Sequence, residues 1–158
     1  MKAVLFILIL SISKSCSYGQ LSSNTIERIT SEVNKVRAKG LMCGNTRMPP
    51  VHAVQWNDKL YEVSLEYATY MNENRHFAHV SKDGEDAGMR LDEVGYNWRY
   101  VGENIAMGQY DFPEVLQDWI ESESHCKMLM SKNMKHFAVA RNKKYWVQTF
   151  ATPMRDSE

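Results

Sequence analysis

Three stretches of the chain place groups that can titrate or bind a metal beside large apolar side chains. They are residues 75–79 (RHFAH), 102–106 (GENIA) and 119–126 (WIESESHC). A titratable group among apolar neighbours is costly to bury unless it is paired, so such groups are either structural partners or parts of a functional site. These stretches therefore hold the residues whose chemistry has to be explained first.

Apolar residues at helical spacing predict four helices that could position these stretches. The first begins at the cap Asn24 with Glu27 completing a capping box, and the second begins at the cap Asn57. A short third helix covers residues 87–94, and the fourth follows the cap Asp111. The residues expected to face the core are Ile26, Ile29, Val33 and Val36, then Leu60, Ser64, Tyr67, Ala68 and Met71, then Met89, Leu91 and Val94, and finally Val115, Leu116, Trp119 and Ile120.

The pattern changes in the last third of the chain. Residues 137–141 and 145–150 alternate as strands do, and the short segment 142–144 between them predicts a hairpin. Residues 100–107 are ambiguous by period and are compatible with a short strand, whereas residues 41–55 have the composition of a loop. Helices followed by an antiparallel hairpin indicate an α+β fold rather than a parallel βαβ sheet.

The length and charge of the chain limit what it can be. A chain of 158 residues is the size of one domain. Lys and Arg number 19 and Asp and Glu also number 19, so the net charge is zero. A general nucleic-acid-binding protein needs a basic excess, so nucleic acid is not an expected partner.

The N-terminus predicts export. Lys2 precedes an apolar run over residues 3–12, and small residues follow it, so residues 1–19 are interpreted as a secretory signal peptide. A core helix at this position is the alternative. The run is too short to span a bilayer, and the mature chain, residues 20–158, is expected to lack a transmembrane segment and to be secreted or periplasmic.

Cysteine usage agrees with an oxidising compartment. Cys16 would leave with the signal peptide, and Cys43 and Cys126 would remain. An even pair in an exported protein predicts a disulfide. The alternatives are two buried free thiols, or Cys126 acting as a metal ligand beside His125.

Five motifs in a fixed order resemble the CAP superfamily of cysteine-rich secretory, antigen 5 and pathogenesis-related 1 proteins, and above all its single-domain SCP-like members. The resemblance runs from Ile26 to Phe150. It implies a CAP domain over residues 20–158, folded as a three-layer α–β–α sandwich with a central, mainly antiparallel sheet. The motifs are residues 54–57 (VQWN), 77–79 (FAH) and 102–106 (GENIA), the Trp119, Ser122, His125 and Cys126 run, and residues 145–150 (YWVQTF).

The resemblance also implies a cleft with two histidines and two acidic residues. His79 and His125 match the histidines, which in the family can bind a divalent metal, often zinc, and Glu103 matches one of the acids. The second acid would fall at Ser122. Its neighbours Glu121 and Glu123 are candidates, but a one-residue shift turns a helical side chain by about 100°, so neither is an automatic substitute.

The chemistry of this set allows two functions. Two neutral imidazoles completed by water make a half-site for an optional Zn²⁺, and Glu103 could orient one ring or hold a water. The alternative is that each histidine has only a structural role and forms a hydrogen bond with a buried backbone or carboxylate group. Zinc-bound water beside Glu103 as general base would make a peptidase or amidase, yet hydrolases usually fix zinc with three protein ligands.

We therefore expect a binding protein more than an enzyme. Members of the family are linked to sterol or fatty-acid binding, so a small apolar ligand or an extracellular polymer is the expected partner. The alternative is a zinc-assisted extracellular hydrolase. A purely structural or adhesive protein has no support from repeats or an anchor in the sequence.

Overall fold

The computed structural model describes residues 21–154, so the predicted signal peptide lies outside the described residues. A four-stranded sheet forms its centre, in the order β3 (Gln55–Trp56), β5 (His136–Asn142), β6 (Tyr145–Pro153) and β4 (Trp98–Met107). β3 is parallel to β5, and the other neighbours are antiparallel. The sheet is therefore mainly antiparallel, as expected.

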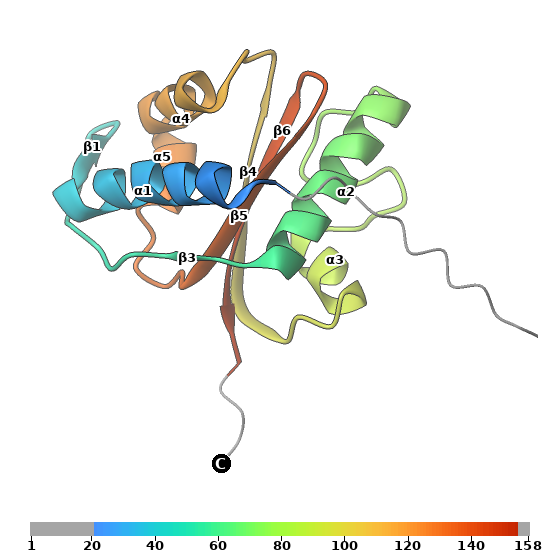
Figure 1. Cartoon of the computed structure of the whole chain (residues 1–158), viewed down its shortest axis with the longest axis horizontal. Helices are drawn as coiled ribbons and strands as arrows, with labels where there is room; N and C mark the ends of the chain where they lie inside the picture. The colour runs from blue at the N-terminus through green and yellow to red at the C-terminus, as the bar shows by residue number, and fades with distance from the viewer. Residues whose placement is uncertain (1–20, 155–158) are drawn as a thin grey trace, which may run out of the picture.

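Helices cover both faces of this sheet (Figure 1). α1 (Ser23–Lys39), α4 (Phe112–Glu121) and α5 (Glu123–Leu129) lie on one side, and α2 (Asp58–Asn74) and α3 (Ala87–Glu93) lie on the other. The three-layer α–β–α sandwich is thus confirmed. No helix within residues 21–154 is both long and apolar enough to cross a membrane.

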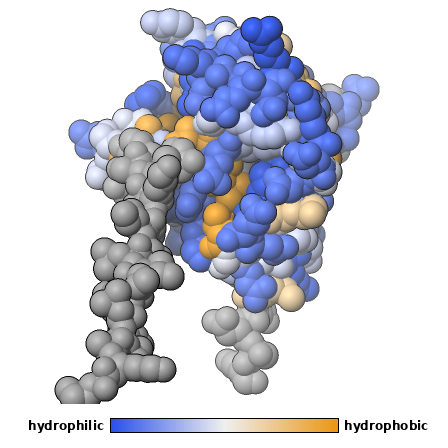
Figure 2. Space-filling model, turned by 90° about the vertical axis from the view of Figure 1, so that its right-hand side faces the viewer, coloured by the Kyte–Doolittle hydropathy of each residue, from blue (hydrophilic) through white to orange (hydrophobic). Residues whose placement is uncertain are grey.

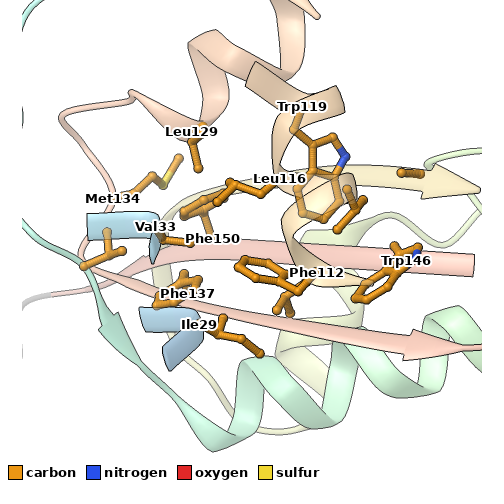
Figure 3. Close-up of a cluster of buried hydrophobic side chains, with 14 residues drawn as sticks. Ile29, Val33, Phe112, Leu116, Trp119, Leu129, Met134, Phe137, Trp146 and Phe150 are labelled. Carbon is orange, nitrogen blue, oxygen red and sulfur yellow. The ribbon is translucent and has the colours of Figure 1, made fainter. Parts of the chain in front are cut away.

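The layer between α1, α4 and the sheet contains the largest apolar cluster. Figure 3 shows this cluster, which includes Phe112 and Trp119 of α4, Ile29 and Val33 of α1, and Phe150 of β6. All five are at most 5% exposed. Burying each such side chain contributes roughly 1.5–3 kcal/mol, so this cluster holds the α1 and α4 layer on the sheet.

The start of α1 differs from the prediction. Ser22, not Asn24, is the cap: its backbone is extended and its hydroxyl accepts a hydrogen bond from the Thr25 amide at 3.3 Å. Asn24 lies inside the helix, so the capping box with Glu27 is wrong. Consecutive Ser-Ser-Asn residues can all cap, and local sequence does not choose among them.

The start of α2 is as predicted. The Asn57 side chain accepts hydrogen bonds from the amides of Lys59 and Leu60, at 3.1 and 3.3 Å. Its expected core residues are buried.

Figure 2 shows the side of the molecule to the right in Figure 1, which is mostly hydrophilic with a narrow strip of hydrophobic residues.

The short helix α3 is rotated relative to the prediction. Met89 was expected to face the core, but it is 52% exposed, whereas Leu91 is fully buried. The neighbouring Arg90 turns inward instead and is 6% exposed. Seven residues are two turns, too few for apolar spacing to fix which side faces inward, and an ion pair described below decides it.

Three further differences concern short elements. β4 has ten residues, Trp98–Met107, and is longer than the predicted strand. The expected loop 41–55 contains the hairpin of β1 (Leu41–Cys43) and β2 (Thr46–Met48), and β3 begins at its last residue, Gln55. α5 was not predicted. Its seven residues are secured from outside by the disulfide, a contact that local periodicity does not report.

The disulfide joins Cys43 of β1 to Cys126 of α5 across 83 positions of sequence. Both cysteines are fully buried, in a small cluster with Met130. The predicted bridge is confirmed, and both alternatives, free thiols and a metal-ligating Cys126, are wrong. The bond fixes the small hairpin against the helix that carries His125.

Candidate functional site

The candidate site is built on the outermost strand of the sheet. β4 has β6 as its neighbour in the sheet, and Glu103 lies opposite Thr149 of that strand. The Glu103 side chain is 4% exposed. A buried carboxylate is stable only when it is paired, so its partners define the site.

Two cationic or polar partners hold the two oxygens of Glu103. Nδ1 of His79 lies 2.9 Å from Oε1, and Nη2 of Arg90 donates to Oε2 at 2.8 Å. His79 comes from the loop after α2, whereas Arg90 lies on α3. The carboxylate of Glu103 thereby links three segments that are distant in sequence.

Arg90 is locked in place by the layer beneath it. Its guanidinium lies over the ring of Tyr67, 3.5 Å from the ring centroid, and Nη1 donates to the Glu85 carbonyl at 3.1 Å. Burial raises the pKa of Tyr67 to about 12, so its hydroxyl stays protonated. That hydroxyl donates to the carbonyl of Ala78 at 2.6 Å and fixes the loop that leads to His79.

His79 is presented to solvent by these contacts. Its side chain is 54% exposed. An ionised carboxylate can only accept a hydrogen bond, so Nδ1 of His79 donates to Glu103 and Nε2 carries the free lone pair. The ring lines a cavity of about 370 Å³ together with Glu103, Trp98 and Val101. Nε2 is therefore the atom of His79 that can take a metal or a ligand proton.

His125 lies on α5, a helix that contacts β4. Burial, and then the charge of His79, lower its pKa, so the neutral ring is favoured. Nδ2 of Asn104 donates to the His125 carbonyl at 3.3 Å and to Oε1 of Gln148 at 3.0 Å. Two consecutive residues of β4 thus hold the two histidine segments. Glu103 contacts the side chain of His79, and Asn104 donates to the backbone carbonyl of His125.

This order of motifs on this fold matches a known protein family. The family described as CAP, the cysteine-rich secretory protein family, matches residues 30–150. The chain belongs to the CAP family. The resemblance inferred from the sequence is confirmed over most of the chain.

The chain is similar to a curated bacterial protein and to two solved structures. The uncharacterized membrane protein YlbC of Bacillus subtilis is 34% identical over 97 residues, which are 61% of this chain and 28% of that protein. An extracellular SCP-domain protein from Bacillus anthracis has a TM-score of 0.69 at 24% identity, covering 85% of this chain and 45% of the other. An outer surface protein from Borrelia burgdorferi has a TM-score of 0.69 at 22% identity, covering 84% and 95%.

These likenesses carry different weight. At under 25% identity, the two solved structures establish the fold of the CAP domain and nothing finer. This chain spans less than a third of the curated relative. Both solved neighbours are described as extracellular or outer-surface proteins.

Glu121 and Glu123 do not join the site of the CAP domain. Glu121 is exposed at the end of α4 and accepts a hydrogen bond from Gln117 at 2.7 Å. Glu123 is exposed at the start of α5 and pairs with Lys127 at 2.6 Å. Within the described residues neither forms a hydrogen bond or an ion pair with His79 or Glu103.

The donor set for a metal is small. In the part of the chain that the structure describes, no group of three or more His, Cys, Asp or Glu residues could hold a metal ion. What remains is the pair of imidazoles, with His79 offering an exposed nitrogen and His125 favoured in its neutral form. Such a donor set can bind a divalent ion only with water completing the shell.

Sequence reasoning missed Arg90 and Tyr67. Both support the site, and both are nearly fully buried. The spacing of apolar residues placed Tyr67 in the core but gave no sign of the cation above its ring. The one signal that could have indicated Arg90 was Glu103 itself, because a carboxylate buried inside a protein requires a cation close to it.

Proposed function

We propose that this CAP-domain protein is secreted and binds a small apolar ligand, specifically a fatty acid. The observation that supports this is a groove of about 290 Å³ between the start of α1, the start of α4 and strand β5. Leu21, Ile29, Phe112, Val139 and Trp146 form its apolar part. Small-molecule sites are concave, mostly apolar and fitted with a few polar groups, and this groove has that character.

The charges beside the groove favour a fatty acid over a sterol. The lining includes two cations, Arg28 and Arg141, and one acid, Asp111, whose side chain caps α4. Arg141 is held above the ring of Trp146, 5.0 Å from its centroid, and donates to the carbonyl of Tyr110. A carboxylate head beside a guanidinium and an acyl tail against the apolar wall would satisfy both parts. A sterol has no anionic group for these cations.

The two histidines supply an accessory site in this proposal. Nε2 of His79 and the ring of His125 would be the protein ligands of a divalent ion such as Zn²⁺, with water as the other ligands. Bound zinc would act as a Lewis acid. Glu103 orients His79 through Nδ1, a partner of the kind that fixes a metal-binding ring.

The arrangement around Glu103 favours binding over hydrolysis. A general base must accept a proton from water, whereas both oxygens of Glu103 already accept hydrogen bonds from Arg90 and His79. With two imidazoles as the ligands, the zinc-assisted hydrolase lacks the third protein ligand that such sites commonly use. A binding role therefore uses the observed contacts without breaking them.

The fatty-acid proposal is tested with a variant that fills the groove. Thr25 lines the groove at the edge of α1, so Thr25→Trp should abolish the fluorescence rise of cis-parinaric acid, a naturally fluorescent fatty acid. Glu27→Trp, exposed on the same helix, is the matched control and should bind as the wild type does. Equal binding by both variants, or displacement by cholesterol but not by palmitate, would overturn the proposal.

The metal site is tested separately by calorimetric titration of zinc into the wild type, His79→Ala and His125→Ala. Both variants should lose most of the heat, because each removes half of the protein ligands. Equal heats in all three proteins would show that His79 and His125 do not bind zinc, and the fatty-acid proposal would still stand.

A further inference from the structure

A separate cavity lies at the end of the sheet where α2 ends and the β5–β6 hairpin turns. Figure 1 shows these two segments at the same end of the molecule, at the top of the view. The cavity measures about 420 Å³ and is lined by Asn72, Arg75, Phe77, Met107, Lys144 and Tyr145. It shares no lining residue with the cavity of His79 or with the fatty-acid groove.

The charge of this cavity is positive. Arg75 and Lys144 line it, Lys143 occupies the same turn, and none of the lining residues is acidic. Within residues 21–154 the structure gives the Arg75 guanidinium no hydrogen-bond or ion-pair partner. Two cations that face one cavity without a neutralising carboxylate form a site for an anion.

The backbone at these cations is unusual. Arg75 has φ 48° and Lys143 has φ 54°, and they are the non-glycine residues of the described chain with positive φ. Glycine adopts this conformation at no steric cost, whereas a side chain is disfavoured there. Glycine at either position would therefore remove a charge and relax the backbone at the same time.

Apolar side chains surround the cavity and remain open to solvent. Phe77 is 45% exposed and Met107 is 42% exposed, and both line the cavity. The Lys144 carbonyl accepts a hydrogen bond from the Gly108 amide at 2.8 Å, which holds the loop after β4 against the hairpin turn. Cations and large apolar side chains therefore share one end of the fold.

We propose that this end of the molecule docks on an anionic lipid surface. A lipid phosphate lies between Arg75 and Lys144, Lys143 of the same turn lies near the headgroups, and Phe77 and Met107 enter the interfacial layer. A soluble phosphate would satisfy the two cations but would leave the side chains of Phe77 and Met107 in water. A lipid surface satisfies both, because aromatic side chains favour the membrane interface and basic groups favour anionic headgroups.

The test measures co-sedimentation of the purified mature protein, residues 20–158, with vesicles of phosphatidylcholine alone or mixed with phosphatidylglycerol. Binding should require phosphatidylglycerol and weaken with salt. Arg75→Gly and Lys143→Gly should each reduce the partition coefficient about fivefold, the effect of one basic residue near a charged surface. Both variants should keep or raise the midpoint of urea unfolding, because glycine relieves the positive φ. Loss of binding would therefore not be a folding defect.

Two controls make the result decisive. Lys35→Gln removes one exposed charge from α1 and should leave vesicle binding unchanged. Phe77→Ser should reduce the binding that persists at high salt. Equal binding to neutral and anionic vesicles, an equal loss with Lys35→Gln, or binding of glycerol phosphate without binding of vesicles would each overturn the proposal.

Discussion

Arg90 and Glu103 form an ion pair that is almost completely removed from water. Nη2 and Oε2 lie 2.8 Å apart, and the two side chains are 6% and 4% exposed. Arg90 comes from the short helix α3, and Glu103 comes from the edge strand β4, so the pair fixes the rotation of the helix and the position of the carboxylate together. His79 depends on this pair for its orientation.

Removing the cation of this pair should destabilise the fold. Arg90→Met leaves Glu103 buried without its cation, and breaking a buried pair in this way costs roughly 3–5 kcal/mol. The free energy of unfolding in urea measures the loss. Arg90→Met combined with Glu103→Met should recover most of it, because no buried charge is left. A single-variant loss below about 1 kcal/mol, the value of a surface pair, would show that the pair is solvated.

Neutralising Glu103 should weaken the proposed metal site without removing a ligand. Glu103→Gln keeps the shape of the side chain, but its hydrogen bond with Nδ1 of His79 is no longer charge-assisted. Loss of such a ligand-orienting group typically lowers metal affinity 10–100-fold. Zinc titration by calorimetry measures the change, and Glu121→Gln, which contacts Gln117 instead, should bind zinc as the wild type does. An unchanged zinc affinity in Glu103→Gln would show that Glu103 does not support the metal site.

The disulfide should contribute strongly to stability. Cys43 and Cys126 are 83 positions apart, and the chain-entropy model gives about 4.5 kcal/mol for closing a loop of that length. Cys43→Ala with Cys126→Ala should lower the unfolding midpoint accordingly, in urea and on heating. Reduced wild-type protein should behave like the double variant. No difference between oxidised and reduced protein would mean that the bridge constrains nothing in the unfolded chain.

Stability should fall at mildly acidic pH because of two histidines. Burial lowers the pKa of His136 and of His125 below the ordinary value of 6.5, with smaller contributions from the charges of Lys135 and His79. The unfolded chain then binds protons more tightly than the folded protein. The stabilisation is complete above pH 6.5 and is lost as pH falls through the lowered pKa values.

The contact of His136 gives this prediction a specific variant. Nδ1 of His136 lies 2.7 Å from the Tyr96 hydroxyl, and burial raises the pKa of Tyr96 to about 12, so the hydroxyl keeps its proton and is able to donate it to Nδ1 of the neutral ring. Protonating the ring removes that acceptor. His136→Gln should reduce the loss of unfolding free energy between about pH 7.5 and about pH 5. His52→Gln, on an exposed residue, should leave the loss unchanged, and an identical pH dependence in His136→Gln would contradict the assignment.

Local sequence pattern predicted correctly those features whose interacting groups all lie within a few residues of one another. The cap at Asn57 and the cap at Asp111 each need a polar side chain and the amides that follow it, all within a few residues. The β5–β6 hairpin is likewise a local pattern of alternation and turn. Met89 shows the limit of such signals, because a helix of two turns has too few apolar residues to fix its rotation.

The sequence by itself determined the CAP family and the α+β class and predicted the Cys43–Cys126 pairing, because motif order, periodicity and the number of cysteines can all be read directly from the chain. Only the tertiary structure decided what lies around Glu103. Arg90 and His79 reach it from segments 13 and 24 positions away, and the side on which each residue lies depends on packing against the sheet. Burial of a carboxylate and the choice of its partners are properties of three-dimensional contact, and no local spacing encodes them.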